Sequence, residues 1–242
     1  FQEGLNLIPY YARFNKINPL KCENNYYTMK GVCYNSKGTD YVDLVAKELG
    51  IVYVDTGAIY RSIGYYIYKN GMDPKDAAAV VAVLPQIQVD MRYSDDGLQH
   101  MLLNGEDVTE QIRLPEISMY ASAVSALPSV RAFLLDAQRA LAKDNNVLMD
   151  GRDIGTTILP DADVKIYLTA SVETRAKRRY DELKEKGEDC NLEEIAHDIE
   201  ERDHRDMTRE IAPLKQAEDA VLVDSSHMTI EEVVKAIVDL CK

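Results

Sequence analysis

The sequence predicts an α/β fold built on a parallel sheet. Four apolar runs typical of buried strands recur along the chain, and segments of helical sequence long enough for parallel crossovers separate the later ones. Polar residues and glycines follow directly after two of these runs. The candidate strands cover residues 51 to 55, 147 to 150, 164 to 168 and 220 to 224. A chain of 242 residues with 46% hydrophobic content is long enough for one such domain with an insertion.

The helices between these strands carry readable start signals. One helix follows the first strand and reaches about Lys69. Further starts are predicted at Asp73 before Pro74, at Pro128, at Asn191 with Glu194 and at Thr229 with Glu232. These signals are side chains that cap the first turn, or a proline that fits the first helical position.

One region departs from the alternation of strands and helices. Residues 86 to 108 alternate polar and apolar side chains around the turn sequence 94 to 97, and Asn104 with Gly105 ends a second arm. Asn-Gly pairs favour tight hairpin turns. We therefore expect a small antiparallel insertion here.

The stretch from Val147 to Thr156 is the most informative part of the sequence, because an apolar strand runs directly into acid, glycine, arginine and acid. Ligands of open α/β sheets bind beyond the carboxyl ends of the strands. Arg152 can bind phosphate oxygens, Asp150 can hold a magnesium ion through water, and Asp153 can accept a hydrogen bond. A strand-ending turn with solvated charges remains the alternative.

A second strand ends in a similar way. Asp55 and Thr56 follow the run from Ile51 to Val54, and Arg61 lies one turn inside the helix that begins there. The alternative interpretation is an ordinary capped helix with Arg61 in water.

A third pattern is a stripe along one helix face whose character changes from apolar to ionic. Its members recur at spacings of three and four: Leu192, Ile195, Ile199, Arg202, Asp206 and Arg209. Charge runs are usually solvated faces. The continuity of this stripe instead favours a core-facing row that enters a polar cavity supplying an anion, since unpartnered buried charges are costly. Arg175, Arg178 and Arg179 share a face of the preceding helix and add cationic reach.

Charge and cysteine content narrow the function classes. A net charge of −13 argues against nucleic acid or anionic membrane surfaces as partners. No apolar run reaches about 18 residues and no secretory leader pattern is visible. Cys22, Cys33, Cys190 and Cys241 lack metal-type spacing. We expect a cytoplasmic protein, a monomer, with no nucleic-acid or membrane partner.

At these residues the chain resembles the bacterial cytidylate kinases, which transfer phosphate from ATP to CMP or dCMP. The three stretches above carry the resemblance together with residues 117 to 139 and 212 to 214, and from about Lys47 onward it is essentially continuous. It implies a P-loop nucleoside monophosphate kinase fold, with a central parallel sheet flanked by helices and a small antiparallel insertion. Residues 31–242 would then form a single kinase domain, with a monophosphate-side insertion near 85–113 and a mobile lid near 171–190.

The resemblance also implies roles for individual residues. Those implied to hold the acceptor phosphate or the transferring group are Arg61, Arg152, Arg202 and Arg209, with Thr56 beside the acceptor. Those implied to read cytosine are Ser122, Arg131 and Asp153, with Asp206 on the sugar and Arg178 as a lid arginine over the phosphates. The cofactors implied are ATP and Mg²⁺, with Gly31, Lys37, Gly38 and Thr39 for ATP and Asp150 and Thr39 for the metal.

The N-terminal segment departs from this family. Residues 1 to 43 contain two of the three Phe, six of the fifteen Tyr and two of the four Cys. In the loop from Gly31 to Thr39, Tyr34 and Ser36 stand where the family has glycines, and residues 25 to 30 are a poor central parallel strand by composition. Either the loop is degenerate, or residues 1 to about 43 are not the natural reading, for example through a frame error upstream of Leu44. Composition favours the second interpretation, and residues 1–30 are a segment of uncertain status.

Two rival functions stay open from the sequence. The arginines alone would also suit a kinase for UMP, AMP or a small alcohol, and Ser122, Arg131 and Asp153 together favour cytosine. The departure in the loop would suit a CMP-binding protein without catalysis. The sequence does not decide between CMP and dCMP.

Overall fold

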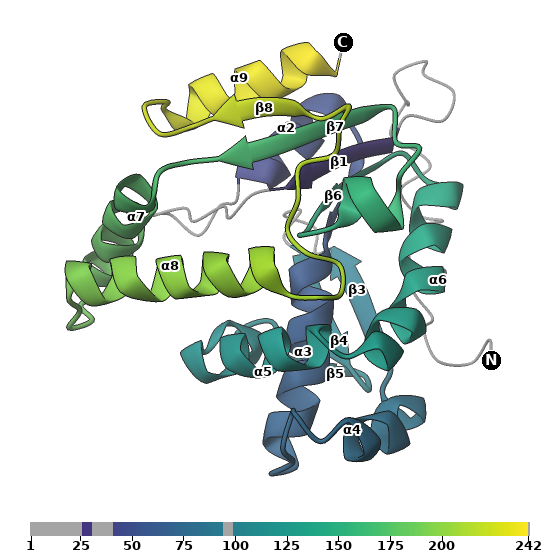
Figure 1. The fold of residues 1–242 in the computed structure, drawn as a ribbon. Helices are drawn as coiled ribbons and strands as arrows, with labels where there is room; N and C mark the ends of the chain where they lie inside the picture. Colours follow the sequence, from purple (N-terminus) through teal and green to yellow (C-terminus); the bar gives the residue numbers. More distant parts are fainter. Residues whose placement is uncertain (1–25, 31–40, 94–98, 242) are drawn as a thin grey trace. The chain divides into compact units, whose positions relative to one another are not determined.

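The computed structural model describes residues 26–30, 41–93 and 99–241 (Figure 1). These residues form two compact units. Among the described residues, unit 1 comprises 55–145, and unit 2 comprises 26–30, 41–54 and 146–241. We describe each unit by itself.

Unit 2 is built on a five-stranded sheet in the order β2-β6-β1-β7-β8. The strands are β1 (Tyr26–Lys30), β2 (Val52–Asp55), β6 (Val147–Asp150), β7 (Val164–Thr169) and β8 (Val221–Asp224). The pairs β1 with β6, β1 with β7, and β7 with β8 are parallel. The four strands predicted from apolar runs are confirmed, and Val147, Leu148 and Met149 of β6 are fully buried, as expected of a parallel strand covered on both faces.

The central strand is β1, which composition had marked as a poor candidate for that place. Tyr26 lies beside Val147 of β6, and Tyr27 lies beside Val164 of β7. The compositional expectation was therefore wrong. Ladder hydrogen bonds use backbone groups, which every residue except proline provides, so side-chain composition is only a weak guide to strand pairing.

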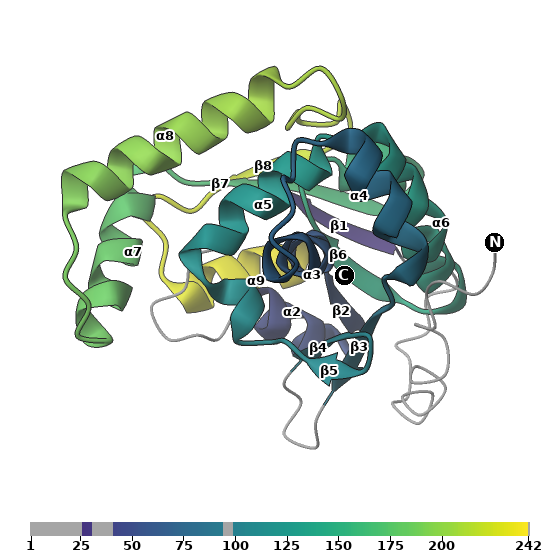
Figure 2. The same cartoon turned by 90° about the horizontal axis from the view of Figure 1, so that it is seen from below.

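Helices α2 (Tyr41–Leu49) and α9 (Ile230–Leu240) build the main core of unit 2 with the sheet. Val45 and Leu49 of α2 meet Val233 and Ile237 of α9 in one buried cluster. The predicted start of α9 is confirmed as a reciprocal cap between Thr229 and Glu232. Two further helices, α7 (Val172–Glu185) and α8 (Leu192–Thr208), lie side by side in both views of the ribbon (Figures 1 and 2).

Unit 1 contains four α-helices among the residues that the structure describes: α3 (Thr56–Lys69), α4 (Ala77–Val83), α5 (Pro115–Ser125) and α6 (Pro128–Asp144). Short turns of helix, η1 (Leu84–Gln86) and η2 (Gln111–Arg113), lie between them in sequence. The predicted end of α3 at Lys69 and the predicted start of α6 at Pro128 are both confirmed.

The antiparallel insertion is also confirmed. Strands β3 (Val89–Tyr93), β4 (Gln99–Leu103) and β5 (Glu106–Asp107) form an antiparallel sheet in that order. Asn104 and Gly105 connect β4 to β5 with φ angles of 50° and 85°. Positive φ at both central residues is what a tight hairpin turn requires, so the Asn-Gly pair predicted this turn correctly.

One helix start was predicted three residues too early. Asp73 and Pro74 form a turn in which the Asp73 carboxylate accepts from the Lys75 N–H. Helix α4 begins at Ala77, and Asp76 is its cap, accepting from the Ala79 N–H at 3.0 Å. The sequence offers two Asp residues with the same capping chemistry, and tertiary context selects the second. The predicted cap Asn191 of α8 is confirmed.

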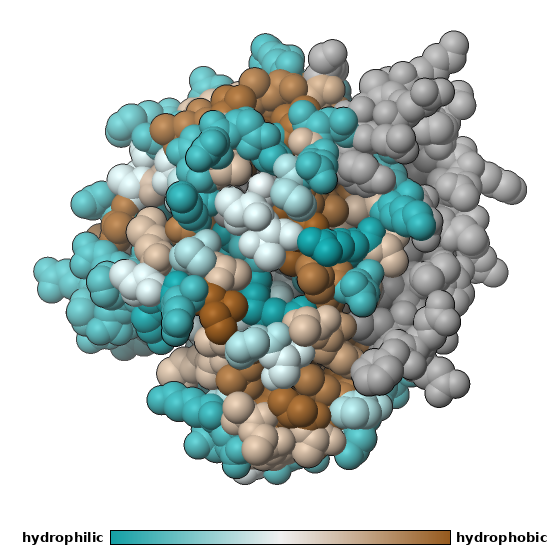
Figure 3. Space-filling view, turned by 45° about the vertical axis from the view of Figure 1, so that its right-hand side comes forward, coloured by the Kyte–Doolittle hydropathy of each residue, from teal (hydrophilic) through white to brown (hydrophobic). Residues whose placement is uncertain are grey.

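Several large apolar side chains stay exposed, among them Met119, Leu222 and Leu114. Figure 3 shows hydrophobic and hydrophilic side chains interspersed over the face viewed. Within the described ranges no single helix is long and apolar enough to cross a membrane; α5 and α6 reach that length and composition only as a pair bent by 93°.

Candidate functional site

The first part of the candidate site is the N-terminal end of α3 in unit 1. The Asp55 carboxylate caps this helix by accepting from the Ala58 N–H at 2.8 Å. Its second oxygen accepts from Arg113 Nη2 at 3.0 Å, so both carboxylate oxygens are engaged. Thr56, the first residue of the helix, is only 3% exposed. Asp55 is therefore the N-cap of α3, and it fixes the position of Thr56.

Arg61 lies farther along the same helix and is half-buried. Its Nη1 atom donates to the Ile112 carbonyl of η2 at 3.1 Å. This contact ties the guanidinium to the segment that precedes α5. Arg61 therefore does not simply extend into water, which was the alternative interpretation of this arginine.

Helix α5 packs unusually closely against α3, and this brings Ser122 to its place. A Cβ atom at Gly64 of α3 would lie 2.8 Å from the backbone nitrogen of Ala121. Only glycine permits such an approach without a shift of one helix. Ser122 directly follows Ala121 in α5, so the close backbone contact between α3 and α5 also fixes the position of Ser122.

Ser125 links Ser122 to Arg131 in unit 1. The Ser125 hydroxyl donates to the Ser122 carbonyl at 2.9 Å, and the Ser125 carbonyl accepts from Arg131 Nη1 at 3.2 Å. The Arg131 guanidinium also lies over the Tyr60 ring, 5.7 Å from its centre. Ser125, Tyr60 and Gly64 were missed by the sequence analysis, because their roles come from contacts between helices that no local pattern reports.

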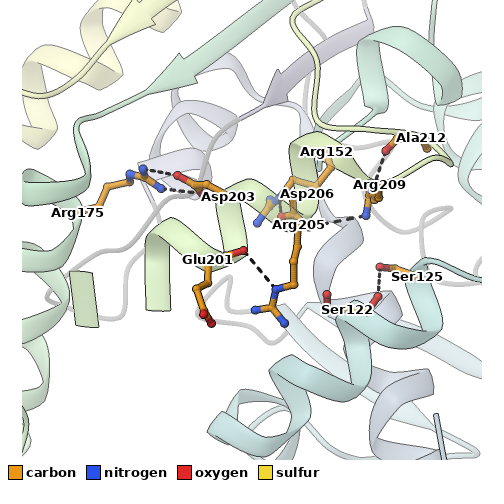
Figure 4. Close-up of polar contacts among 10 residues, drawn as sticks. All are labelled: Ser122, Ser125, Arg152, Arg175, Glu201, Asp203, Arg205, Asp206, Arg209 and Ala212. Carbon is orange, nitrogen blue, oxygen red and sulfur yellow. Dashed lines mark hydrogen bonds and ion pairs between the residues drawn. The ribbon is translucent and has the colours of Figure 1, made fainter. Parts of the chain in front are cut away.

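In unit 2 the centre of the candidate site is an ion pair between the loop after β6 and helix α8. Arg152 Nε donates to Asp206 Oδ2 at 2.8 Å, and the two side chains are 19% and 11% exposed (Figure 4). A charge-assisted bond with so little water around it is among the stronger polar contacts in proteins. Of the two interpretations of the sequence after β6, the structure therefore excludes the one with a solvated Arg152.

Arg209 completes this cluster at the end of α8. Its Nη1 atom lies 3.9 Å from Asp206 Oδ1, and its Nε atom donates to the Ala212 carbonyl at 2.7 Å (Figure 4). Ala212 holds a φ of 48°, a left-handed conformation that is uncommon for alanine. The Leu214 N–H donates back to the Asp206 carbonyl at 2.7 Å. Residues 209 to 214 thus form a tight turn that fixes the Arg209 side chain.

The predicted stripe along α8 is confirmed in part. Ile199 and Asp206 are buried, and Ile195, Arg202 and Arg209 are half-buried. Leu192 is 40% exposed, so the expectation of a core-facing row is wrong at this first position. Residues 191–194 at the start of α8 are all exposed, and a sequence periodicity does not reveal where along a helix the packing begins.

The three arginines predicted to add cationic reach on α7 all have partners within unit 2. Arg175 forms a two-pronged pair with Asp203 of α8, at 3.0 and 2.5 Å. Arg179 donates to Glu182 at 2.8 Å. Arg178 donates from Nη2 to the Ser225 carbonyl at 2.7 Å, in the loop after β8. Arg175 and Arg179 therefore have their charge neutralised locally, whereas the contacts of Arg178 within the described ranges are with hydroxyl and carbonyl oxygens.

Asp150 and Asp153 lie at and just after the carboxyl end of β6. The Asp150 carboxylate accepts from the Tyr53 hydroxyl at 3.2 Å. Asp153 is 4% exposed, and its carbonyl begins the turn η3 (Ile154–Ile158) by accepting from three successive N–H groups. Mg²⁺ in phosphotransfer sites is held by one or two carboxylates, waters and phosphates. A half-buried carboxylate at a strand end, as at Asp150, fits that requirement, although the described ranges contain no group of three or more acidic, His or Cys ligands.

The residues predicted to bind ATP lie outside the described part of the chain. They are Gly31, Lys37, Gly38 and Thr39, of which Thr39 was also predicted as a metal ligand.

A parallel sheet whose strand ends carry arginines paired with carboxylates is typical of proteins that bind phosphorylated ligands. Comparison with known sequences gives the family: the cytidylate kinase model matches residues 36–242, and the chain belongs to this family. It is 49% identical over 197 residues to the cytidylate kinase of Caldicellulosiruptor bescii, covering 81% of this chain and 87% of that protein. The cytidylate kinases of Lactobacillus johnsonii and Bacteroides fragilis are 46% and 45% identical, each over 81% of this chain and covering 85% and 87% of those proteins.

Proposed function

We propose that the chain transfers the γ-phosphoryl group of ATP to CMP or dCMP, giving CDP or dCDP. Family membership supports the reaction, and the Arg152–Asp206–Arg209 cluster is the observation in the structure that supports it most directly. Phosphoryl transfer needs positioning and charge neutralisation more than covalent help. Arginines held in fixed orientations by a buried carboxylate supply both.

We assign the acceptor phosphate and the transferring group to four arginines, Arg61, Arg152, Arg202 and Arg209. Guanidinium groups suit this task because they keep their charge and present paired N–H groups to phosphate oxygens. Three of these arginines have anchored side chains. Arg61 donates to the Ile112 carbonyl, Arg152 to the Asp206 carboxylate and Arg209 to the Ala212 carbonyl. An anchored cation loses little further freedom when the substrate binds, which favours catalysis by preorganisation. We place Thr56 beside this acceptor.

We assign the cytosine base to Ser122, Arg131 and Asp153, and the sugar to Asp206. An ionised Asp is an acceptor only, so Asp153 suits the exocyclic amine of cytosine and disfavours the oxygen found there in uracil. Asp153 is almost fully buried, which makes an unpaired acceptor at this position costly. This asymmetry is the physical basis that we propose for selection of cytosine over uracil.

We assign the donor side to ATP with Gly31, Lys37, Gly38 and Thr39, and the metal to Asp150 and Thr39. Mg²⁺, when bound, would neutralise charge on the phosphates. Arg178 lies near the carboxyl ends of β7 and β8 through its contact with Ser225, and we propose that it moves onto the phosphates as part of a lid near residues 171–190. Exclusion of water by such a lid would limit wasteful hydrolysis of ATP.

We further propose a nucleoside monophosphate kinase fold of the P-loop type, formed as a single kinase domain from residue 31 onward with its monophosphate-side insertion near 85–113. The antiparallel strands β3, β4 and β5 support this placement of the insertion. We propose that the enzyme acts as a monomer in the cytoplasm on small-molecule nucleotides.

Separate titrations of CMP and ATP by calorimetry, followed by a coupled assay of ADP release, test this proposal. We expect the chain as printed to bind CMP and to bind ATP poorly, because Tyr34 and Ser36 replace glycines of the phosphate loop. The Tyr34→Gly/Ser36→Gly double variant should recover part of the activity. Replacement of residues 1 to 43 by an apolar strand with an intact glycine-rich loop should give about 1–100 turnovers per second.

Three results would contradict parts of this view. If the protein with its unaltered residues 1 to 43 does not bind CMP, the described residues do not form the acceptor site. An inert chain after replacement of residues 1 to 43 shows that residues 44 to 242 do not carry the activity. Full turnover of the printed chain shows that the loop is functional despite Tyr34 and Ser36.

A further inference from the structure

Arg175 joins three elements of unit 2 through one guanidinium. Its Nε atom donates to the Ala170 carbonyl just after β7, at 3.0 Å. Its two terminal nitrogens donate to the two oxygens of Asp203 on α8, at 3.0 and 2.5 Å (Figure 4). The Arg175 and Asp203 side chains are 9% and 18% exposed. The base of α7, the end of β7 and the middle of α8 are therefore held by one rigid, planar group.

Asp203 lies among the residues of α8 that carry the proposed chemistry. Arg202 precedes it directly, and Asp206 follows it by three residues, so that Asp203 and Asp206 lie on adjoining parts of one helix face. Fixing Asp203 sets both the rotation and the height of α8 at this point. The same constraint then determines where Arg202, Asp206 and Arg209 lie.

The Tyr167 hydroxyl of β7 is influenced by charges from both ion pairs. Burial raises the pKa of the Tyr167 hydroxyl, the Asp203 charge raises it further, and the charges of Arg152 and Arg175 lower it. Tyr167 thus feels both arginines and Asp203 at once. One member of the second ion pair, Arg152, thus acts on the same hydroxyl of β7 as both members of the first.

Stability alone is a weak reason for such a pair. Replacing a buried ion pair by apolar side chains of similar size is often neutral or stabilising, whereas a two-pronged arginine–carboxylate pair fixes geometry. The contacts with Asp203 and with the Ala170 carbonyl together use three of the five N–H groups of Arg175, which argues against Arg175 as a direct phosphate ligand.

We propose that Arg175 and Asp203 are positioning residues, which hold α8 in the placement that Arg202, Asp206 and Arg209 need to act on the acceptor phosphate. This inference rests on the proposed function of that cluster. It also restricts the moving part of the proposed lid near residues 171–190 to the residues beyond Arg175, because the base of the helix pair is clamped to β7.

The test uses the full chain and measures the dissociation constants of cytidine and of CMP. The ratio of the two constants isolates the contribution of the phosphate, and this ratio is compared between wild type and variants. The decisive variant is Arg175→Met/Asp203→Leu, which removes both charges and leaves neither partner buried alone. We expect its thermal stability to stay close to that of the wild type and its phosphate-dependent affinity to fall about tenfold, the loss of one charge-assisted contact. Arg175→Lys keeps the charge but lacks the fork, and an intermediate loss is expected.

The matched control is Lys177→Met/Asp181→Leu, which removes an exposed ion pair from the same helix. We expect this control to leave the ratio unchanged. A ratio equal to the wild-type value in the Arg175→Met/Asp203→Leu variant would overturn the proposal, because the phosphate site would then not depend on the clamp.

Amide hydrogen exchange of residues 199–209 supplies a second readout that needs no ligand. We expect faster exchange there in the Arg175→Met/Asp203→Leu variant and not in the control. If the wild type fails to prefer CMP over cytidine, the proposed function fails, and the exchange measurement alone decides on the clamp. Unchanged exchange in residues 199–209 would then overturn it.

Discussion

The Nε atom of Arg152 lies 2.8 Å from Oδ2 of Asp206, and both side chains are mostly buried. The two residues come from different elements, the loop after β6 and helix α8. One carboxylate therefore orients an arginine that the sequence predicted for phosphate, while its second oxygen lies 3.9 Å from Arg209. We therefore expect the proposed acceptor site to be largely formed before any substrate binds.

The first prediction concerns Arg209→Ala. Because Arg209 lies at the end of α8 and contacts Asp206 and the Ala212 carbonyl, its loss should affect turnover more than folding. An arginine that acts on the transition state can be worth on the order of 10³ in rate. The measurement is kcat with CMP, together with the melting temperature, in a chain whose phosphate loop is intact.

Arg205→Ala is the control for that prediction. Arg205 is exposed on the same helix and donates to the Glu201 carbonyl of its own helix (Figure 4). The Arg205→Ala substitution should leave turnover within about twofold of the wild type, as expected of a surface side chain. Near-normal turnover in the Arg209→Ala variant would remove Arg209 from the catalytic set.

The second prediction concerns choice of base. Asp153→Asn should narrow the preference for CMP over UMP, because an amide can rotate to donate to the oxygen of uracil. Since an unpaired buried acceptor costs about 1–3 kcal/mol, the change in the ratio should be on the order of tenfold. Calorimetric affinities for CMP and UMP measure it, with exposed Asp161→Asn as the control. An unaltered ratio would place Asp153 outside the base pocket.

The third prediction concerns Gln138 of α6, whose side chain is 1% exposed and whose amide oxygen and nitrogen have no hydrogen-bond partner among the residues that the structure describes. A buried polar group without a partner costs about 1–3 kcal/mol. Gln138→Leu should therefore raise the melting temperature by several degrees, at about 2–4 °C per kcal/mol for a chain of this size. A thermal scan checks this, and Gln86→Leu at an exposed position is a comparison that should not stabilise. A lower melting temperature for Gln138→Leu would show that the amide has a partner in solution.

The fourth prediction concerns acid stability. Burial raises the pKa of the Glu182 carboxyl, but hydrogen bonds from Lys186 and Arg179 outweigh this and leave it below its ordinary value of 4.5. A carboxyl whose pKa is depressed by folding stabilises the fold above pH 4.5 and loses that contribution as the pH falls through the folded value. Urea unfolding from pH 6 to pH 3 should thus be less pH-dependent in Glu182→Gln than in the wild type. Equal slopes in the two proteins would contradict the prediction, and Glu188→Gln serves as an exposed control.

Much of the fold follows from local sequence signals. The strands β2, β6, β7 and β8 are continuous apolar runs, the β4–β5 turn is an Asn-Gly pair, and the α9 cap is a Thr-Glu pair. Such signals act over a few residues, so a single sequence contains them completely. The central place of β1 does not follow in this way, because strand order depends on which distant segments pair.

In the candidate site, too, the sequence predicts features that depend on local patterns and not those that depend on contacts between distant segments. Arg152 and Asp206 were found by the sequence because a charged residue stands where the pattern expects a strand end or an apolar face. Three other features depend on contacts between elements and do not follow from local patterns. They are the pairing of Arg152 with Asp206, the ion pair between Arg175 and Asp203, and the link from Ser122 through Ser125 to Arg131. Periodicity fixes the face on which a side chain lies, but not which side chain lies opposite.

The place of β1 at the centre of the sheet has a consequence for folding kinetics. β1 precedes its two neighbours by much of the chain, since Tyr26 pairs beside Val147 and Tyr27 beside Val164. Closing loops of that length costs entropy before any pairing is gained, and folds rich in such contacts form slowly. During synthesis the sheet cannot assemble around β1 until β6 and β7 have left the ribosome. Until then β1 exposes two unpaired edges, which makes this stage the one most open to aggregation.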